Sequence, residues 1–246
     1  MKILLIAGHG AGDPGACACG YQEANLTREV ANMLVPALQR YADVTLYDTS
    51  RNMYSDLKAG KSFAFSKYDY VLEIHFNAAV NDQTGNGITT GSEILVHSKE
   101  SGIGVEQAIL SGLQAIGYRN RGVKRRSDLL VMNTCKGRQG VSYALIEVCF
   151  IDDRDDVNLY QSKKNETVSA IVNGIVKGFG LKSKNDGGVT VFPDVSENDY
   201  AYNQIKKLKD YGIVNGDENG NYNPDAMITR RDMAVIIANM LTFIGK

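Results

Sequence analysis

The chain has 246 residues, of which 43% are hydrophobic and 22% are charged, and its formal net charge is −1. This composition excludes a disordered chain, and the length allows one well-buried domain and a smaller one. The balanced charge excludes the basic surplus that attracts nucleic acid or anionic membranes, and no segment approaches the ~20 apolar residues of a membrane-spanning helix. We therefore expect neither nucleic acid nor a membrane as a partner.

The first 180 residues alternate short apolar runs with amphipathic stretches. Strands are expected at residues 2–7, 44–47, 70–75, 92–97, 128–132 and 142–148. Apolar residues recur at helical spacing over residues 26–38, 105–116 and 168–179, and Gly180 ends the last of these helices. The pattern predicts an α/β fold, a twisted mixed sheet with helices on both faces, in a domain of residues 1–180.

The rest of the chain has a different character. Residues 181–190 are polar, rich in glycine and without periodicity, which predicts a linker. Residues 191–246 are expected to form a small, mainly helical module, with one helix over residues 200–211 that stops at Gly212 and a second that begins at the N-cap Thr229. Two short helices bury little apolar surface, so we expect this module to rest on a neighbour.

The cysteines and one basic run each allow two interpretations. Cys17 and Cys19 stand too close for an easy mutual disulfide, so we expect reduced thiols, with a metal role for this pair as the alternative. The basic run over residues 119–126 is expected to be a solvated loop or a substrate contact rather than a nucleic-acid patch.

Two of the three histidines follow predicted strands. His9 and His75 sit at or just beyond the carboxyl ends of their strands, the edge where sites assemble in open α/β sheets. Glycines on both sides of His9 let the backbone turn sharply, and Glu23 begins the first helix, beside the first strand. Two neutral imidazoles and one carboxylate leave the fourth position of a tetrahedral zinc ion open for water, as catalytic sites require.

Glu147 supplies the remaining chemistry at this edge. It ends an apolar strand and is expected to take the proton of a zinc-bound water. Simpler interpretations stand beside each role: a lone strand-end histidine is often structural, and Glu23 alone would be a favourable charge at a helix N-terminus. His97 is expected to be a surface histidine at a strand end, and Glu73 a strand carboxylate whose direction the pattern leaves open.

A series of short segments resembles the zinc-dependent N-acetylmuramoyl-L-alanine amidases of the amidase-3 type, which are common in bacteria and in phage endolysins. The segments lie in the family's order and span most of residues 1–180. They are AGHG (7–10) with Asp13 and Gly15 after it, Glu23, IHFNA (74–78), GSE (91–93), NRGVK (120–124) followed by Leu129, and EVCFI (147–151) followed by Asp156. Glu73 departs from the family pattern, where a small polar residue is frequent, and so does Cys149, where glycine is usual.

The resemblance implies a reaction and a role for each residue. His9, Glu23 and His75 would bind one Zn²⁺ per chain, and Glu147 would be the catalytic carboxylate. The substrate would be peptidoglycan, cut at the amide between the lactyl group of N-acetylmuramic acid and the L-alanine of the stem peptide, which lyses the cell wall. Glu147 would pass a proton to the leaving amine.

The tail resembles a single S-layer homology repeat. The matching segments are FPDV (192–195), GIVNG (212–216), YNP (222–224) and ITR (228–230). The resemblance implies an anchor that binds a secondary polymer of the Gram-positive wall, with Arg230 on an anionic group. Such repeats usually pack in threes, so a single one suggests a homo-oligomer formed through the tail, or a degenerate anchor.

Two other functions stay open on the sequence alone. One is a zinc peptidase or carboxypeptidase that acts within the stem peptide, and the other is an inactive wall-binding protein. The apolar run at residues 3–7 is too short for a secretory signal. We therefore expect synthesis in the cytoplasm without a signal peptide and action at the wall after release, as for a phage lysin, with a host autolysin as the alternative.

Overall fold

The structure, a computed structural model, describes residues 1–184, 191–197 and 199–245. The chain divides into two compact units, Met1–Lys184 and Asn185–Lys246. Of the predicted linker, residues 185–190 lie outside the described residues. None of the described helices is long and apolar enough to cross a membrane.

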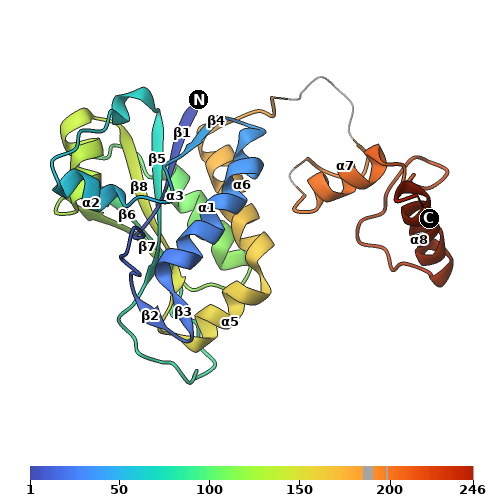
Figure 1. Cartoon of the computed structure of the whole chain (residues 1–246), viewed down its shortest axis with the longest axis horizontal. Helices are drawn as coiled ribbons and strands as arrows, with labels where there is room; N and C mark the ends of the chain where they lie inside the picture. Colours follow the sequence, from blue (N-terminus) through green and yellow to red (C-terminus); the bar gives the residue numbers. More distant parts are fainter. Residues whose placement is uncertain (185–190, 198, 246) are drawn as a thin grey trace. The chain divides into compact units, whose positions relative to one another are not determined.

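A six-stranded mixed sheet forms the centre of the first unit (Figure 1), in the order β4-β1-β5-β8-β6-β7. Strands β4, β1, β5 and β8 are parallel, β6 is antiparallel to β8, and β7 is parallel to β6. The carboxyl ends of β1, β5 and β8 therefore meet the amino ends of β6 and β7 at one edge. The bounds are β1 Lys2–Ala7, β4 Asp43–Leu46, β5 Tyr70–Asn77, β6 Ser92–His97, β7 Asn120–Arg126 and β8 Ser142–Phe150, with a small separate hairpin of β2 Cys17–Ala18 and β3 Tyr21–Gln22.

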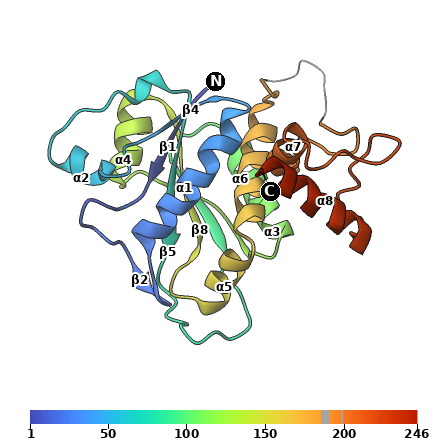
Figure 2. The ribbon, with the colours of Figure 1, turned by 45° about the vertical axis from the view of Figure 1, so that its right-hand side comes forward.

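Helices cover both faces of the sheet, which confirms the predicted fold class (Figures 1 and 2). The larger core lies under α1 Glu23–Gln39, α3 Gly104–Ala115, α5 Arg154–Ser162 and α6 Lys164–Phe179. The smaller core, on the opposite face, lies under α2 Met53–Lys58, the 3₁₀ turn Phe65–Lys67, α4 Leu130–Met132 and the π-helix Asn133–Arg138. Helix α6 stops at Gly180, as predicted.

Strand alternation decides which side chains face the smaller core. Successive residues of a strand point to opposite faces. In β5, Leu72 and Ile74 belong to the larger core, whereas Val71 belongs to the smaller one. In β8, Tyr143 and Leu145 also face the smaller core. Positions 73 and 75 of β5 and position 147 of β8 consequently share the face that α2 and α4 cover.

One predicted strand is wrong, and one strand of the six-stranded sheet was missed, as were the two short strands of the separate hairpin. Residues 128–132 do not form a strand, because Val131 and Met132 are buried as part of the short helix α4 against the smaller core. The sixth strand is instead β7, built from the basic run that was expected to be a solvated loop or a substrate contact. Its charged and mostly exposed residues suit a strand at the edge of a sheet, where charge discourages pairing with another chain.

The second unit contains α7 Tyr202–Asp210 and α8 Arg230–Phe243 around a small apolar core. Phe192, Ile205 and Ile213 are among the buried residues of this core. Helix α8 begins after Thr229, whose side chain accepts the backbone N–H of Asp232 in a capping box. No residue of α8 is buried, so an apolar helix lies largely open to solvent.

Candidate metal centre

The three side chains predicted as metal ligands lie together. One ligand atom from each of His9, Glu23 and His75 falls within 4.8 Å of the other two. Nε2 of His9 is 3.0 Å from Glu23 Oε2, and Nδ1 of His75 is 2.9 Å from Glu23 Oε1. The loop after β1, the start of α1 and the end of β5 bring them to one edge of the sheet, as the sequence predicted for strand-end residues.

Glu23 contacts both imidazoles of this cluster, one with each carboxylate oxygen. Its side chain is buried, and its two oxygens also accept the backbone N–H groups of Ala16, at 3.0 Å, and Phe76, at 3.1 Å. Burial opposes the charge on this carboxylate, but the imidazoles of His75 and His9 outweigh it and hold the pKa of Glu23 well below its ordinary value. The cluster therefore contains a permanently charged carboxylate between two imidazoles.

The loop that carries His9 is held in an unusual backbone conformation. His9 has φ 62° and Gly10 has φ 93°, and the latter is readily adopted by glycine alone. Arg28 of α1 fastens the loop by donating to the carbonyls of Gly8 and His9, both at 3.0 Å. Gly8 serves a different purpose, because a Cβ there would lie 2.4 Å from Cε1 of His75. One glycine beside His9 thus provides the turn, and the other leaves room for the second imidazole.

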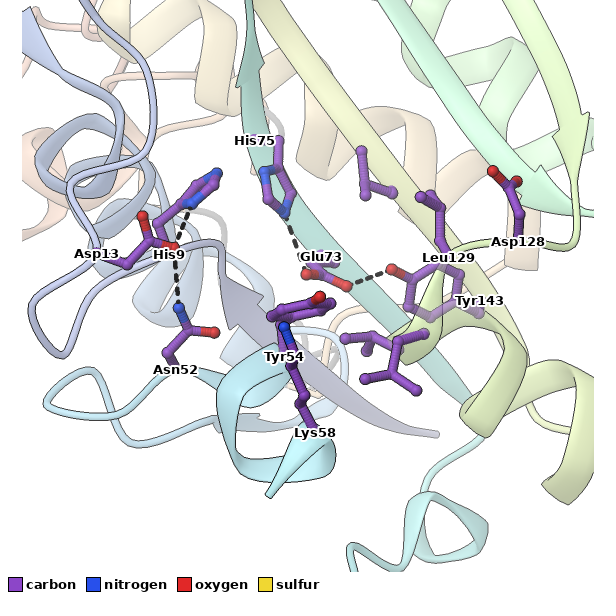
Figure 3. A pocket seen from close by; sticks show the side chains of 13 residues that line it. His9, Asp13, Asn52, Tyr54, Lys58, Glu73, His75, Asp128, Leu129 and Tyr143 are labelled. Atoms are coloured by element: carbon purple, nitrogen blue, oxygen red, sulfur yellow. Dashed lines mark hydrogen bonds and ion pairs between the residues drawn. The ribbon is translucent and has the colours of Figure 1, made fainter. Parts of the chain in front are cut away.

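Each imidazole presents its other nitrogen to a second carboxylate (Figure 3). Nδ1 of His9 lies 2.9 Å from Asp13 Oδ2, and Nε2 of His75 lies 3.1 Å from Glu73 Oε1. Glu73, whose direction the sequence left open, is buried, and its Oε2 accepts a hydrogen bond from the Tyr143 hydroxyl. The negative charge around both rings favours a cation between them.

Glu147 lies beside the cluster and outside it. It occupies the position of β8 that pairs with His75 of β5. Its Oε2 is buried and has no hydrogen-bond partner within the described ranges 1–184, 191–197 and 199–245. Burial is the main cause that raises the pKa of Glu147 to about 7, and the charges of Glu23 and Glu93 add to it. A carboxyl group of this kind can both take and release a proton near neutral pH.

A pair of basic side chains continues the same row across the sheet. Glu93 of β6 pairs in register with Glu147, and it accepts from Arg121 Nε at 2.7 Å and Lys124 Nζ at 2.6 Å. The Arg121 guanidinium lies over the Phe150 ring, 4.8 Å from its centroid, and its terminal nitrogens make no hydrogen bond in the part of the chain that the structure describes. The basic run was expected to be a solvated loop or a substrate contact, and strand β7 excludes the loop.

A cavity of about 550 Å³ opens beside the cluster. His9, Glu73 and His75 line one part of it, while Tyr54 and Lys58 of α2 line another. Leu129, Leu130 and Val131, which lie before and within α4, give it an apolar wall. Polar and apolar walls next to a candidate metal cluster are the features of a cavity that suits an organic ligand.

The remaining candidate residues lie elsewhere. The expectation of a surface position for His97 is wrong, because this residue is 2% exposed and its Nδ1 accepts the backbone N–H of Lys99. The end of β6 is covered by the π-helix, a contact that the sequence pattern does not reveal. Cys17 is exposed and Cys19 buried, and neither belongs to the metal cluster found among the described residues. Arg230 is exposed at the first residue of α8.

Comparison with family models identifies both parts of the chain. The model described as N-acetylmuramoyl-L-alanine amidase matches residues 3–177, and the model for the S-layer homology domain matches residues 191–234. These matches confirm both resemblances that the sequence motifs indicated.

Curated relatives agree with this result. A probable autolysin of Staphylococcus aureus is 30% identical over 193 residues, and the endolysin of Bacillus phage SPP1 is 27% identical over 194 residues. The matched segment covers 72% of this chain and 38% of the autolysin, and 75% of this chain and 68% of the endolysin. A 38.4 kDa protein of Clostridium perfringens is matched over 54% of its length. The chain thus spans about half or less of two of these relatives.

Solved structures share the fold of the first unit. The catalytic domain of CwlV, an amidase of Bacillus (Paenibacillus) polymyxa, superposes with a TM-score of 0.59 at 19% identity, covering 74% of this chain and 99% of that one. The catalytic domain of the CD27L endolysin, which targets Clostridia difficile, gives a TM-score of 0.56 at 23% identity, covering 72% and 97%.

Proposed function

Since the chain belongs to the N-acetylmuramoyl-L-alanine amidase family, we propose that it hydrolyses the amide between N-acetylmuramic acid and the L-alanine of the peptidoglycan stem peptide, with one Zn²⁺ per chain. The observation that carries the proposal is the cluster of His9, Glu23 and His75 with Glu147 beside it. The action is at the bacterial cell wall, where it causes lysis.

The residues present fit a zinc ion. Two imidazoles and one carboxylate are the donor set of catalytic zinc sites, and their donor atoms already lie within 4.8 Å of one another. The free nitrogen of each ring faces a carboxylate, which is the outer support that zinc-bound histidines usually have. When bound, zinc would polarise the scissile carbonyl and acidify the attacking water.

The protein's own groups would then move the proton and orient the substrate. Glu147 Oε2, which has no partner among the described residues, would accept a proton from the water and return it to the leaving nitrogen. Its pKa of about 7 suits both steps. Arg121 and Lys124, on the same row of the sheet, would contact a carboxylate of the peptide.

Product analysis tests this function against its alternatives. Purified walls would be digested and the soluble products identified by mass spectrometry. An amidase releases intact stem peptides that begin with a free L-alanine. A carboxypeptidase would shorten peptides that stay attached to the glycan, and a wall-binding protein without activity would release nothing. Either of the last two outcomes would refute the proposed reaction.

The second unit would hold the enzyme on the wall. Its match to the S-layer homology model and the exposed Arg230 support binding of an anionic secondary wall polymer. Cosedimentation with walls should fall for Arg230→Ala and stay unchanged for the neighbouring Arg231→Ala. Equal binding of both variants and the parent would remove Arg230 from the contact.

The same unit would join copies of the chain. Ile237 and Leu241 of α8 and Ile244 at its C-cap follow one another at spacings of four and three residues, and each is about half exposed. Such an apolar helix face favours burial against a second copy. Sedimentation equilibrium should show an oligomer that Ile237→Asp dissociates, and a monomeric parent at high concentration would contradict self-association.

A further inference from the structure

We propose that Glu73 and Tyr143 form a buried support that fixes the ring of His75, so that Nδ1 of this ring presents its lone pair to the metal. Glu73 is then a positioning residue for zinc, and the inference rests on the zinc site of the proposed function. It concerns a residue that departs from the family pattern.

The contacts connect two neighbouring strands. Glu73 and His75 are two residues apart on β5 and point to the same face, and Nε2 of His75 is 3.1 Å from Glu73 Oε1. Tyr143 of β8 pairs in register with Val71 and donates its hydroxyl hydrogen to Glu73 Oε2. Tyr143 is completely buried and Glu73 is 5% exposed. Both carboxylate oxygens therefore have one defined partner each.

This arrangement selects one tautomer of His75. An ionised carboxylate only accepts hydrogen bonds, so Nε2 must carry the proton. In a neutral ring the lone pair is then on Nδ1, the atom that faces Glu23. Tyr143 in turn holds the carboxylate in place, because its ring is buried in the smaller core and its hydroxyl donates to Glu73 Oε2.

The two imidazoles differ in how well they are supported. Asp13, the partner of His9, has a side chain that is 46% exposed, whereas that of Glu73 is 7% exposed. Among the described residues, Glu73 forms an ion pair with His75 alone and has no lysine or arginine partner. Water screens and competes with the Asp13 contact more than the Glu73 contact. Loss of Glu73 should consequently weaken metal binding more than loss of Asp13.

The test measures zinc affinity by competition with a chromophoric chelator, on the whole 246-residue chain. Glu73→Ala should bind zinc about 10- to 100-fold more weakly than the parent, as outer partners of zinc ligands typically contribute. Glu73→Gln keeps an acceptor for Nε2 of His75 and should lose less zinc affinity than Glu73→Ala. Tyr143→Phe should also bind zinc more weakly than the parent. The comparison variant Asp13→Ala should lose less zinc affinity than Glu73→Ala.

A second readout separates positioning from general stability. In the zinc-loaded parent, nitrogen-15 NMR should show a proton on Nε2 of His75 that is slow to exchange, and Glu73→Ala should make its exchange fast. Parental zinc affinity in both Glu73→Ala and Tyr143→Phe would overturn the inference and leave the amidase proposal standing. If the parent itself failed to bind zinc, the zinc site would fall, and this inference with it. If Glu73→Ala did not fold, the affinities of Glu73→Gln and Tyr143→Phe would decide in the same way.

Discussion

His75 and Glu147 occupy paired positions on the adjacent parallel strands β5 and β8. Paired positions leave the same face of a sheet, so Glu147 stands one strand away from a candidate zinc ligand. The three-residue cluster does not include Glu147, whose Oε2 is buried without a hydrogen-bond partner in the described part of the chain. In the proposed mechanism, this arrangement would assign metal binding to the three-residue cluster and proton transfer to Glu147.

Replacement of Glu147 should separate these two roles. Glu147→Gln keeps the shape of the side chain and cannot accept a proton, so turnover should fall by at least about 100-fold while zinc content stays at one per chain. Turnover on purified peptidoglycan and elemental analysis of zinc check the prediction. His75→Ala is the matched comparison and should lose both. Full turnover in Glu147→Gln would show that another group is the base.

Gly8 should be intolerant of any side chain. A Cβ at this position would lie 2.4 Å from Cε1 of His75, closer than carbon atoms approach without displacement. Gly8→Ala should therefore move His75 and reduce zinc affinity and turnover together, by at least about tenfold. Gly102→Ala is the control, because an added Cβ there meets nothing within 4 Å. Parental zinc binding in Gly8→Ala would mean that the ring has room to shift.

Arg121 should contribute to substrate binding through its planar, forked side chain. Arg121→Lys keeps a positive charge near Glu93 and removes the paired terminal nitrogens. Loss of one hydrogen bond to a charged group costs about 1.5 kcal/mol, so KM should rise roughly tenfold with a smaller change in kcat. Arg119→Lys, at an exposed position of the same run, is the control. An unchanged KM in Arg121→Lys would remove Arg121 from the substrate contact.

Glu106 should make the folded state less stable as the pH rises. It is buried in α3, accepts a hydrogen bond of 3.0 Å from the Tyr70 hydroxyl, and burial raises the pKa of its carboxyl above 4.5. A raised pKa means that the folded state holds the proton more tightly, so the stability contribution is present below the ordinary value and is lost as the pH rises through the raised one. Denaturant titrations from about pH 4 to about pH 8 should show that the free energy of unfolding of Glu106→Gln rises relative to that of the parent as the pH increases. A difference in the free energy of unfolding between the two proteins that stays constant with pH would contradict this prediction.

The sequence predicted which residues lie together in the candidate site better than it predicted the strands and helices around them. His9, His75 and Glu147 are recognisable because polar residues near or just beyond the carboxyl ends of buried strands stand out against apolar neighbours, and parallel strands bring such residues to one edge. Strand β7 was missed because an exposed edge strand has little apolar alternation, with Val123 as its one aliphatic residue. The apolar run at residues 128–132 was mistaken for a strand because a buried helical turn and a buried strand look alike over so few residues.

The supports of the cluster lay beyond sequence reasoning. Arg28, Asp13 and Glu73 act through hydrogen bonds whose partners depend on loop conformation and strand register. The hydroxyl that holds Glu73 comes from Tyr143, 70 residues further along the chain. The same applies to His97, which the neighbouring π-helix buries. A pattern of residue types identifies a donor or an acceptor, and only the fold brings its partner within reach.

We propose that His9, Glu23 and His75 bind one catalytic zinc ion, and the proposed reaction depends on this ion. Elemental analysis of the purified parent and of His9→Ala, each loaded with zinc and dialysed, measures this most directly. We expect about one zinc per parent chain, far less in His9→Ala, and release of stem peptides only by the zinc-loaded parent. Equal zinc in both proteins, or undiminished peptide release after a chelator has removed the metal, would contradict it.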